Sequence, residues 1–136
     1  MSKRPYTENE RIYNKAYRQK HIDRYKAYDQ IKNKLPKYRY RQSLSNAKKR
    51  NLCWEISYED FVKNLETPCY YCQGRMNNPS QHGCHMDRID NDKGYTLDNI
   101  LPCCGSCNRV RGLVLTVEET KLAIEVVLAH RAKQTE

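Results

Sequence analysis

Four of the seven cysteines form two pairs whose spacing suits a bound metal ion. Two residues separate Cys69 from Cys72 and Cys104 from Cys107, and 31 residues lie between the pairs. Two residues between thiolates let both sulfurs of a tight turn reach one metal, and two such turns complete a tetrahedral Zn²⁺ site. Four protein ligands leave no open position, so we predict a structural zinc ion. The alternative is four ordinary buried thiols.

Three cysteines remain outside this predicted site. Cys103 directly precedes Cys104 and is an alternative ligand, with three residues rather than two before Cys107. Cys104 is preferred because it makes the tighter turn. Cys53 and Cys84 are expected to be packed side chains rather than ligands.

A run of polar residues, "HMDRID" from His85 to Asp90, lies between the cysteine pairs. In a strand, His85, Asp87 and Ile89 would share one face. The turn signal "NDKG" follows, and "NILPC" reads as a returning strand. The second cysteine pair then opens a short helix, "CNRVRG". We therefore predict a β-β-α unit whose hairpin is clamped to its helix by zinc.

The positive charge is concentrated near the start of the chain. Residues 1–50 carry sixteen Lys/Arg and four Asp/Glu, a net charge of +12, whereas residues 51–136 carry nine and twelve, a net charge of −3. Such asymmetry indicates a segment that binds a polyanion. The alternative is a solvated helix that only aids solubility.

Residues 8–35 are predicted to form one long helix that ends at Pro36. Its Tyr residues share a face, which could contact DNA or pack on the rest of the protein, and Lys and Arg fill the other faces. The predicted nucleic-acid contacts are Arg11, Lys15, Arg18, Arg24, Lys37, Arg39, Arg41, Lys48, Lys49, Arg50, Arg109 and Arg111.

Further elements flank the cysteine-rich segment. We predict a basic helix over residues 37–50, a short strand over 52–56 and a helix capped by Ser57. Thr116 and Glu119 form a capping-box pattern before a final helix. The apolar residues expected to pack this helix are Leu122, Ile124, Val126, Val127 and Leu128.

The composition limits the hydrophobic core. Hydrophobic residues make up 38% of the chain and the mean hydropathy is −1.00, so a metal ion is expected to supply stability. The first residues lack the apolar segment of a signal peptide, and no apolar run is long enough for a bilayer. We therefore expect an intracellular, cytoplasmic protein that uses its cysteines for metal rather than disulfides.

The order of these motifs resembles the HNH nucleases, the ββα-metal group, in their zinc-clamped form. The pattern CxxC, HxDRID, GYTxDN and PCCxxCN is found in short phage and large-virus proteins of this kind. The resemblance covers about residues 44–130 and is tightest over 69–112. It implies an α+β fold with a small ββα-metal core stapled by a four-cysteine zinc site, flanked by helices, with a basic N-terminal helical arm.

The resemblance also implies roles for single residues. Asp87 matches the aspartate that binds the catalytic Mg²⁺ or Mn²⁺, and Asn108 matches the helix residue that completes the protein ligands of that ion. Asn99 matches the asparagine that ties the loop and orients the catalytic base. One carboxylate and one amide oxygen are hard ligands that leave room for water and phosphate.

This sequence departs from the family at the catalytic base. Arg88 stands where a histidine usually follows the metal aspartate, and a guanidinium is a poor proton acceptor. His85 occupies an H-x-D position that phage Holliday-junction-resolving endonucleases also use. We hypothesise that His85 is the base and that Arg88 holds a phosphate oxygen; His82 and Tyr95 are further candidates for the base. The alternative is that His85 only positions Asp87.

The resulting prediction is a DNA-binding arm over residues 1–43 and a zinc-clamped nuclease domain over 44–136. Together they would form a metal-dependent endonuclease on double-stranded DNA, of the phage or viral homing type, with no membrane partner and a possible homodimer. The alternatives are an inactive zinc-stabilised DNA-binding protein, which Arg88 favours, and a nuclease acting on RNA.

Overall fold

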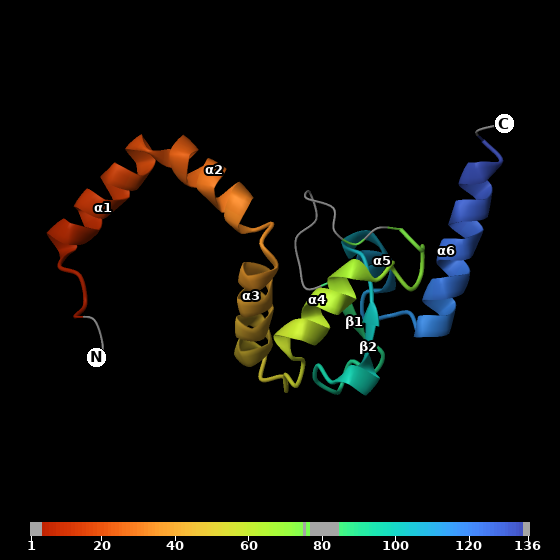
Figure 1. Ribbon diagram of the computed structural model, residues 1–136. Helices are drawn as coiled ribbons and strands as arrows, with labels where there is room; N and C mark the ends of the chain where they lie inside the picture. The colour runs from red at the N-terminus through yellow and green to blue at the C-terminus, as the bar shows by residue number, and fades with distance from the viewer. Residues whose placement is uncertain (1–3, 75, 77–84, 135–136) are drawn as a thin grey trace. The chain divides into compact units, whose positions relative to one another are not determined.

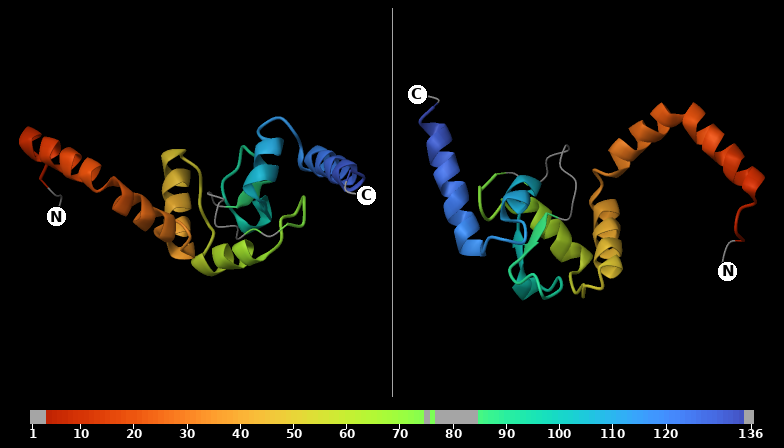
Figure 2. Two further views of the ribbon diagram at one scale, coloured as in Figure 1. Left: turned by 90° about the horizontal axis from the view of Figure 1, so that it is seen from above. Right: turned by 180° about the vertical axis from the view of Figure 1, so that it is seen from behind.

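This computed structural model describes residues 4–74, 76 and 85–134. Contacts divide the chain into unit 1, Met1–Leu35, and unit 2, Pro36–Glu136. Figures 1 and 2 show the helices and strands of both units. The domain boundary predicted between residues 43 and 44 falls inside helix α3, Pro36–Lys49.

Unit 1 contains two helices rather than the one predicted. Helix α1, Glu8–Lys20, begins at a capping box between Thr7 and Glu10, and helix α2, Ile22–Lys32, follows it. The break lies at His21, whose backbone (φ −113°, ψ 24°) leaves the helical region.

The prediction that Pro36 ends this helical segment was also wrong, because α2 ends at Lys32 and Pro36 opens α3. A proline is well suited to a first helical position, where its missing N–H would have no partner.

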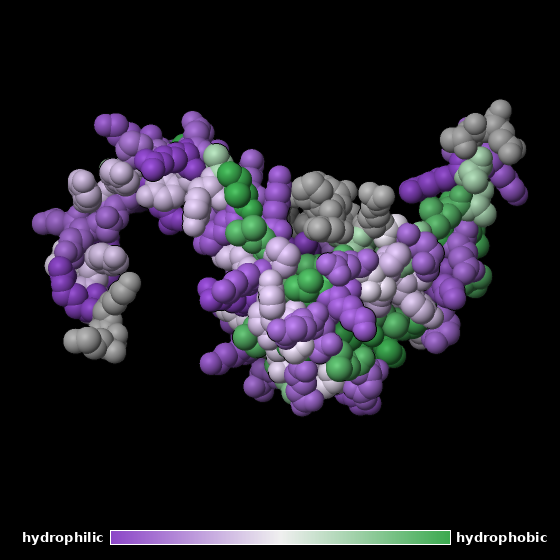
Figure 3. All heavy atoms as spheres, in the orientation of Figure 1, coloured by the Kyte–Doolittle hydropathy of each residue, from purple (hydrophilic) through white to green (hydrophobic). Residues whose placement is uncertain are grey.

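The face of unit 1 seen in Figure 3 is mostly hydrophilic, with some hydrophobic atoms exposed. Neither α1 nor α2 contains a buried residue. The tyrosines expected on one face are all exposed, namely Tyr13, Tyr17, Tyr25 and Tyr28. These tyrosines are therefore not buried within unit 1, and both uses of this face, contact with DNA and packing on the rest of the protein, stay predictions.

In unit 2, α3 and helix α4, Tyr58–Glu66, lie beside one hydrophobic cluster. Ser57 caps α4 as predicted, because its hydroxyl accepts a hydrogen bond from the Asp60 backbone N–H. The buried residues of the cluster are Ala47, Ile56, Phe61, Leu65, Met86 and Tyr95. This cluster fixes the first strand of the sheet, since Met86 belongs to that strand.

The predicted β-β-α unit is present. Strand β1, Met86–Arg88, pairs antiparallel with β2, Ile100–Pro102, so that Asp87 lies opposite Leu101. A 3₁₀ turn, Leu97–Asn99, precedes β2, and helix α5, Gly105–Arg111, follows it (Figure 1). The strand predicted at 52–56 is reduced to an isolated bridge between Trp54 and Tyr95.

The turn before this bridge depends on a glycine. A Cβ atom at Gly94 would lie 2.4 Å from the carbonyl oxygen of Cys53, which is far inside van der Waals contact. Because Tyr95 exchanges backbone hydrogen bonds with Cys53 and Glu55 here, the two segments approach each other closely.

Helix α6, Val117–Ala132, begins at the predicted capping box of Thr116 and Glu119. Its packing differs from the prediction. Ile124 is buried together with Val117 and Thr120, but the other apolar residues expected to pack are 42–63% exposed: Leu122, Val126, Val127 and Leu128. The helix therefore packs along a strip about one residue wide, and Figure 3 shows apolar atoms along its visible side. Within the described ranges, no helix is both long and apolar enough to span a lipid bilayer.

Candidate metal centre and active site

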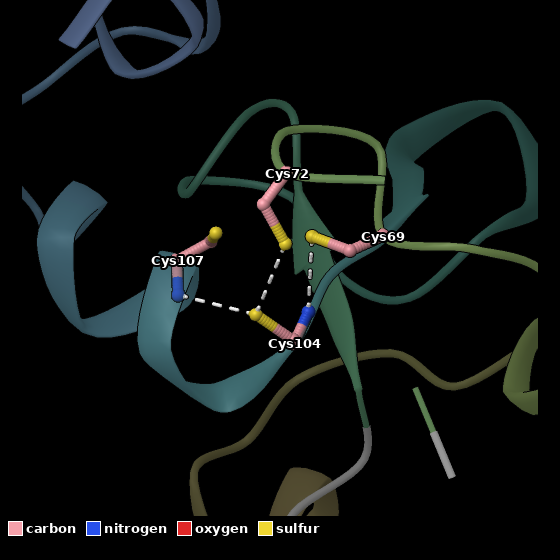
Figure 4. Close-up of side chains that lie close together, drawn as sticks. All are labelled: Cys69, Cys72, Cys104 and Cys107. Atoms are coloured by element: carbon pink, nitrogen blue, oxygen red, sulfur yellow. Dashed lines mark hydrogen bonds between the residues drawn. The ribbon is translucent and has the colours of Figure 1, made fainter. Parts of the chain in front are cut away.

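The two cysteine pairs meet in a four-cysteine cluster of Cys69, Cys72, Cys104 and Cys107 (Figure 4). Their sulfur atoms all lie within 4.8 Å of one another, and the Cys72 and Cys104 sulfurs are 3.9 Å apart. Tetrahedral ligands at the Zn–S distance of about 2.3 Å would place sulfurs about 3.8 Å apart. The cluster could therefore hold a tetrahedral metal ion, as the spacing predicted.

Backbone hydrogen bonds shape the cluster. The first pair lies in a tight turn closed by the Cys69 N–H, which donates to the Gly74 carbonyl over 3.0 Å. In the second pair, Cys104 is the N-cap of α5, and its sulfur accepts from the Cys107 N–H over 3.4 Å. The Cys104 N–H donates to the Cys69 sulfur over 3.3 Å. This last donor favours the thiolate form of Cys69, the form that binds metal.

The remaining thiols differ from one another. Cys103 is buried and its thiol donates to the Cys104 carbonyl over 3.4 Å, while its closeness to the Cys69 sulfur is the first cause that lowers the pKa of Cys69 to about 4. It thus lies next to the cluster and is not one of its four members. Cys53 is exposed, with its sulfur 3.2 Å from a Glu55 carboxylate oxygen, so the expectation that it is packed was wrong. Cys84 lies outside the described residues.

Asp87 is buried on β1 with both carboxylate oxygens hydrogen-bonded. The Tyr71 hydroxyl donates to Oδ2 over 2.5 Å, and Arg111 Nη1 donates to Oδ1 in an ion pair. Burial first, and then the Asp87 hydrogen bond, raise the pKa of Tyr71 above its usual range. The phenol is therefore protonated and acts as a donor.

The side chain of Arg111 is buried rather than presented to a nucleic acid. It is 3% exposed, and it also donates to the backbone carbonyls of Arg88 and Ile89. The sequence alone did not reveal this ion pair, because Asp87 and Arg111 are 24 positions apart in the chain. The one hint in the sequence is that Arg111 follows Asn108, a predicted site residue, by one turn of the same predicted helix.

The two predicted asparagines have different surroundings. Asn99 is buried and ties the loop: its Oδ1 accepts from the Asp90 N–H over 2.9 Å, and its Nδ2 donates to the carbonyls of Asp90 and Gly94. Asn108 is exposed on α5. Asn108 lies three residues, about one helical turn, before Arg111, the residue of α5 that is hydrogen-bonded to Asp87.

Arg88 braces the turn that follows β1. Its Nη1 donates to the carbonyls of Asn91 and Lys93 over 2.8 and 2.6 Å, and its guanidinium lies over the ring of Tyr95, 5.4 Å from the centroid. The residue is 7% exposed. The phosphate-binding role of Arg88 therefore stays a prediction. Tyr95, a further candidate for the base, is buried beneath it.

His85 lies just before β1, and its backbone φ is +54°. The predicted alternation with Asp87 therefore does not extend to His85, because a residue in the left-handed region is not part of a regular strand. The residue is 4% exposed, and both ring nitrogens are buried. His82 lies outside the described residues.

Burial of His85 predicts a stability that depends on pH. Burial first, and then the positive charge of Arg39, lower the pKa of His85 from 6.5 to about 4. Between these values the unfolded chain binds a proton that the folded chain does not. The contribution of His85 to the free energy of unfolding is therefore expected to be constant above about pH 7 and to fall, by up to about 1.4 kcal/mol per pH unit, as pH decreases from 6.5 towards 4.

Urea unfolding of the wild type and of His85→Gln between about pH 7.5 and pH 5 measures this component. His130→Gln is the matched control, because His130 is exposed on α6. The same pH slope in the wild type and in His85→Gln would contradict the assignment of this component to His85.

The predicted nucleic-acid contacts divide by exposure. Ten of the twelve are exposed, whereas Arg39 and Arg111 are buried. In unit 1, a hollow of about 450 Å³ is lined in part by Lys15, Arg18 and Lys26. The guanidinium of Arg18 lies 5.6 Å from the centroid of the Tyr25 ring. This hollow gathers positive charge at the bend between α1 and α2.

No family model matches this chain. A segment of 72 residues is 32% identical to uncharacterized protein R423 of Acanthamoeba polyphaga mimivirus. The segment covers 53% of this chain and 13% of that protein, so the chain spans only a small part of the relative's length.

Among solved structures, the chain is similar to the rare-cutting HNH restriction endonuclease PacI. The TM-score is 0.56 with 18% sequence identity, over 74% of this chain and 81% of that chain. This likeness concerns the fold. The α+β architecture, the small two-stranded sheet followed by a helix, and the four-cysteine cluster together confirm the predicted HNH-like fold.

Proposed function

We propose that this protein is a metal-dependent endonuclease of the HNH type that hydrolyses phosphodiester bonds in double-stranded DNA. The observation that supports the proposal is the HNH-like ββα unit, in which Asp87 of β1 is hydrogen-bonded to Arg111 of α5, the helix that also carries Asn108. We further propose that the four-cysteine cluster holds a structural Zn²⁺.

The donor set at Asp87 fits a hard divalent cation such as Mg²⁺ or Mn²⁺. A carboxylate has about four lone-pair positions, and Tyr71 and Arg111 use two of them. The remaining positions and the exposed Asn108 amide oxygen would bind the cation, with water and phosphate completing its shell. When bound, such an ion stabilises charge on the phosphate and on the leaving oxygen.

His85 is the proposed general base. Its lowered pKa supports this role, since a neutral imidazole accepts a proton at neutral pH. Its burial opposes the role in the free protein, because a base must reach the attacking water. Cleavage rates of His85→Ala across pH decide the matter, and near-normal rates would remove His85 from the mechanism. Asn99 would hold the loop between β1 and β2 in place.

A second function, that of an inactive zinc-stabilised DNA-binding protein, is favoured by the ion pair between Asp87 and Arg111. The guanidinium of Arg111 already neutralises the carboxylate of Asp87, which is the proposed ligand of the divalent ion. Incubation of plasmid DNA with the protein and Mg²⁺ or Mn²⁺, beside an EDTA control and an RNA substrate, separates these functions. DNA cleavage that requires the divalent ion supports the endonuclease, and cleavage of RNA alone would contradict DNA as the substrate.

Unit 1 is proposed to bind the DNA backbone. Replacing Lys15, Arg18 and Lys26 together by glutamine is expected to reduce the slope of log K against log salt concentration by up to about 3, since each lost phosphate contact removes about 0.9. Fluorescence anisotropy of a labelled duplex at several salt concentrations measures the slope.

The matched control removes the same charge elsewhere, at the exposed residues Lys63, Arg131 and Lys133. An equal loss of slope in both triple variants would mean that overall charge, and not unit 1, sets the affinity.

The wider biological assignments are family expectations that accompany this proposal. They are a homing-type role in a phage or virus and, because one ββα site cuts one strand, a homodimer for double-strand cleavage. Mapping the cleaved ends on a long natural DNA tests the first, and sedimentation of the DNA-bound protein tests the second.

A further inference from the structure

The side chains that hold Asp87 come from the two segments that carry the cysteine pairs. Tyr71 lies between Cys69 and Cys72, and Arg111 lies four residues after Cys107 on α5. These two side chains are here called the carboxylate clamp.

The clamp restricts the carboxylate more than one contact would. Tyr71 and Arg111 donate to different oxygens of Asp87, so rotation about the Cβ–Cγ bond would break both hydrogen bonds. All three side chains are buried, with residue exposures of 3–5%. In this dry surrounding, hydrogen bonds to a charged group are strong and the loss of a partner is costly.

The guanidinium of Arg111 is itself held in place. Besides Asp87, it donates to the carbonyls of Arg88 and of Ile89, the latter over 2.9 Å. The planar guanidinium therefore donates to three consecutive residues at the end of β1, namely Asp87, Arg88 and Ile89. A lysine could not reproduce this geometry.

The clamp joins the four-cysteine cluster to Asp87. The turn that carries Tyr71 is closed by the Cys69 N–H bond to Gly74, and α5 begins at Cys104, a member of the cluster. A metal ion in the cluster would fix both segments, and each segment contributes one donor to the same carboxylate.

We infer that Tyr71 and Arg111 are positioning residues through which the four-cysteine site sets the orientation of the metal-binding carboxylate of Asp87. The inference rests on the proposed role of Asp87 as a ligand of the divalent ion. The zinc site then does more than stabilise the fold, because it prepares the second metal site for its ion.

The test is Mn²⁺ affinity, measured by electron paramagnetic resonance on zinc-loaded protein without DNA. Tyr71→Phe removes one hydroxyl and keeps the ring. It is expected to raise the Mn²⁺ dissociation constant by about 10-fold, in the range found when a partner of a metal ligand is removed. Arg111→Lys, which keeps the charge but loses the planar guanidinium, is expected to weaken Mn²⁺ binding as well.

The controls are matched in chemistry. Tyr70→Phe removes the neighbouring hydroxyl, and Arg131→Lys makes the same change on an exposed part of α6; both are expected to bind Mn²⁺ like the wild type. Zinc content and circular dichroism identify folded variants. If Arg111→Lys does not fold, Tyr71→Phe alone decides.

The outcomes separate the two proposals. Equal Mn²⁺ affinity in the wild type and in zinc-replete Tyr71→Phe, with weaker binding by Asp87→Asn, would overturn the clamp and leave the proposed function intact. Equal affinity in the wild type and Asp87→Asn, or no Mn²⁺ binding at all, would overturn both.

Discussion

Asn108→Ala is expected to lower the rate of DNA cleavage by about 10³-fold, and Asp87→Asn by at least as much. Each change removes a proposed ligand of the divalent ion, and with it several kcal/mol of charge stabilisation in the transition state. The measurement is the rate of plasmid cleavage at saturating Mg²⁺ or Mn²⁺, with DNA binding measured in parallel.

The two variants differ in their expected effect on folding. Asn108 is exposed, so its replacement should leave stability unchanged within about 0.5 kcal/mol. Asp87 is the partner of a buried guanidinium, and leaving that charge unpaired costs about 3–5 kcal/mol. Asn108→Ala is therefore the cleaner test, and exposed Asp98 provides the matched control Asp98→Asn. Equal absence of cleavage in the wild type and both variants would end the endonuclease proposal.

Cys104→Ser and Cys107→Ser are expected to unfold most of unit 2. Binding of structural zinc contributes about 10–16 kcal/mol in small zinc domains, which is as large as the total stability of about 5–15 kcal/mol of an ordinary domain. The cysteine cluster also forms the centre of one of the hydrophobic clusters of unit 2, where Cys69, Cys104 and Cys107 pack with Tyr71. Circular dichroism on heating and zinc content by mass spectrometry measure the result.

Two further serine variants sharpen this prediction. Cys53 is exposed, so Cys53→Ser should keep both the zinc and the melting temperature. Cys103→Ser tests the alternative ligand, because this buried thiol lies next to Cys104 in the chain. Loss of zinc in Cys103→Ser with retention in Cys104→Ser would reverse the ligand assignment.

The features that the sequence predicted correctly depend on short-range chemistry. The spacing within each cysteine pair, the cap at Ser57 and the capping box at Thr116 act over three residues or fewer. The hairpin followed by α5 was predictable because its turn and its helix start carry distinctive residues.

The errors concern interactions that a local pattern does not contain. The apolar residues of α6 recur with the period of a helix, which led to the prediction that they are packed. The period does not show how much of the helix surface the neighbouring elements cover, and most of these residues are exposed. His85 left the strand because of a positive φ, and Arg111 was assigned to nucleic acid because its charge is visible in the sequence and its carboxylate partner is not. The predicted site residues Asp87 and Asn108 do lie on the two elements that this arginine joins.

The break at His21 changes the path that unit 1 can follow. Helices α1 and α2 have 13 and 11 residues, which correspond to about 20 Å and about 16 Å of helix axis. Together the two helices are about as long as one turn of B-DNA. A single straight helix of that length would follow the curved groove only over a short part of its length. In the proposed complex with DNA, two shorter segments with a change of direction between them (Figure 2) would each stay close to the groove as it winds around the duplex.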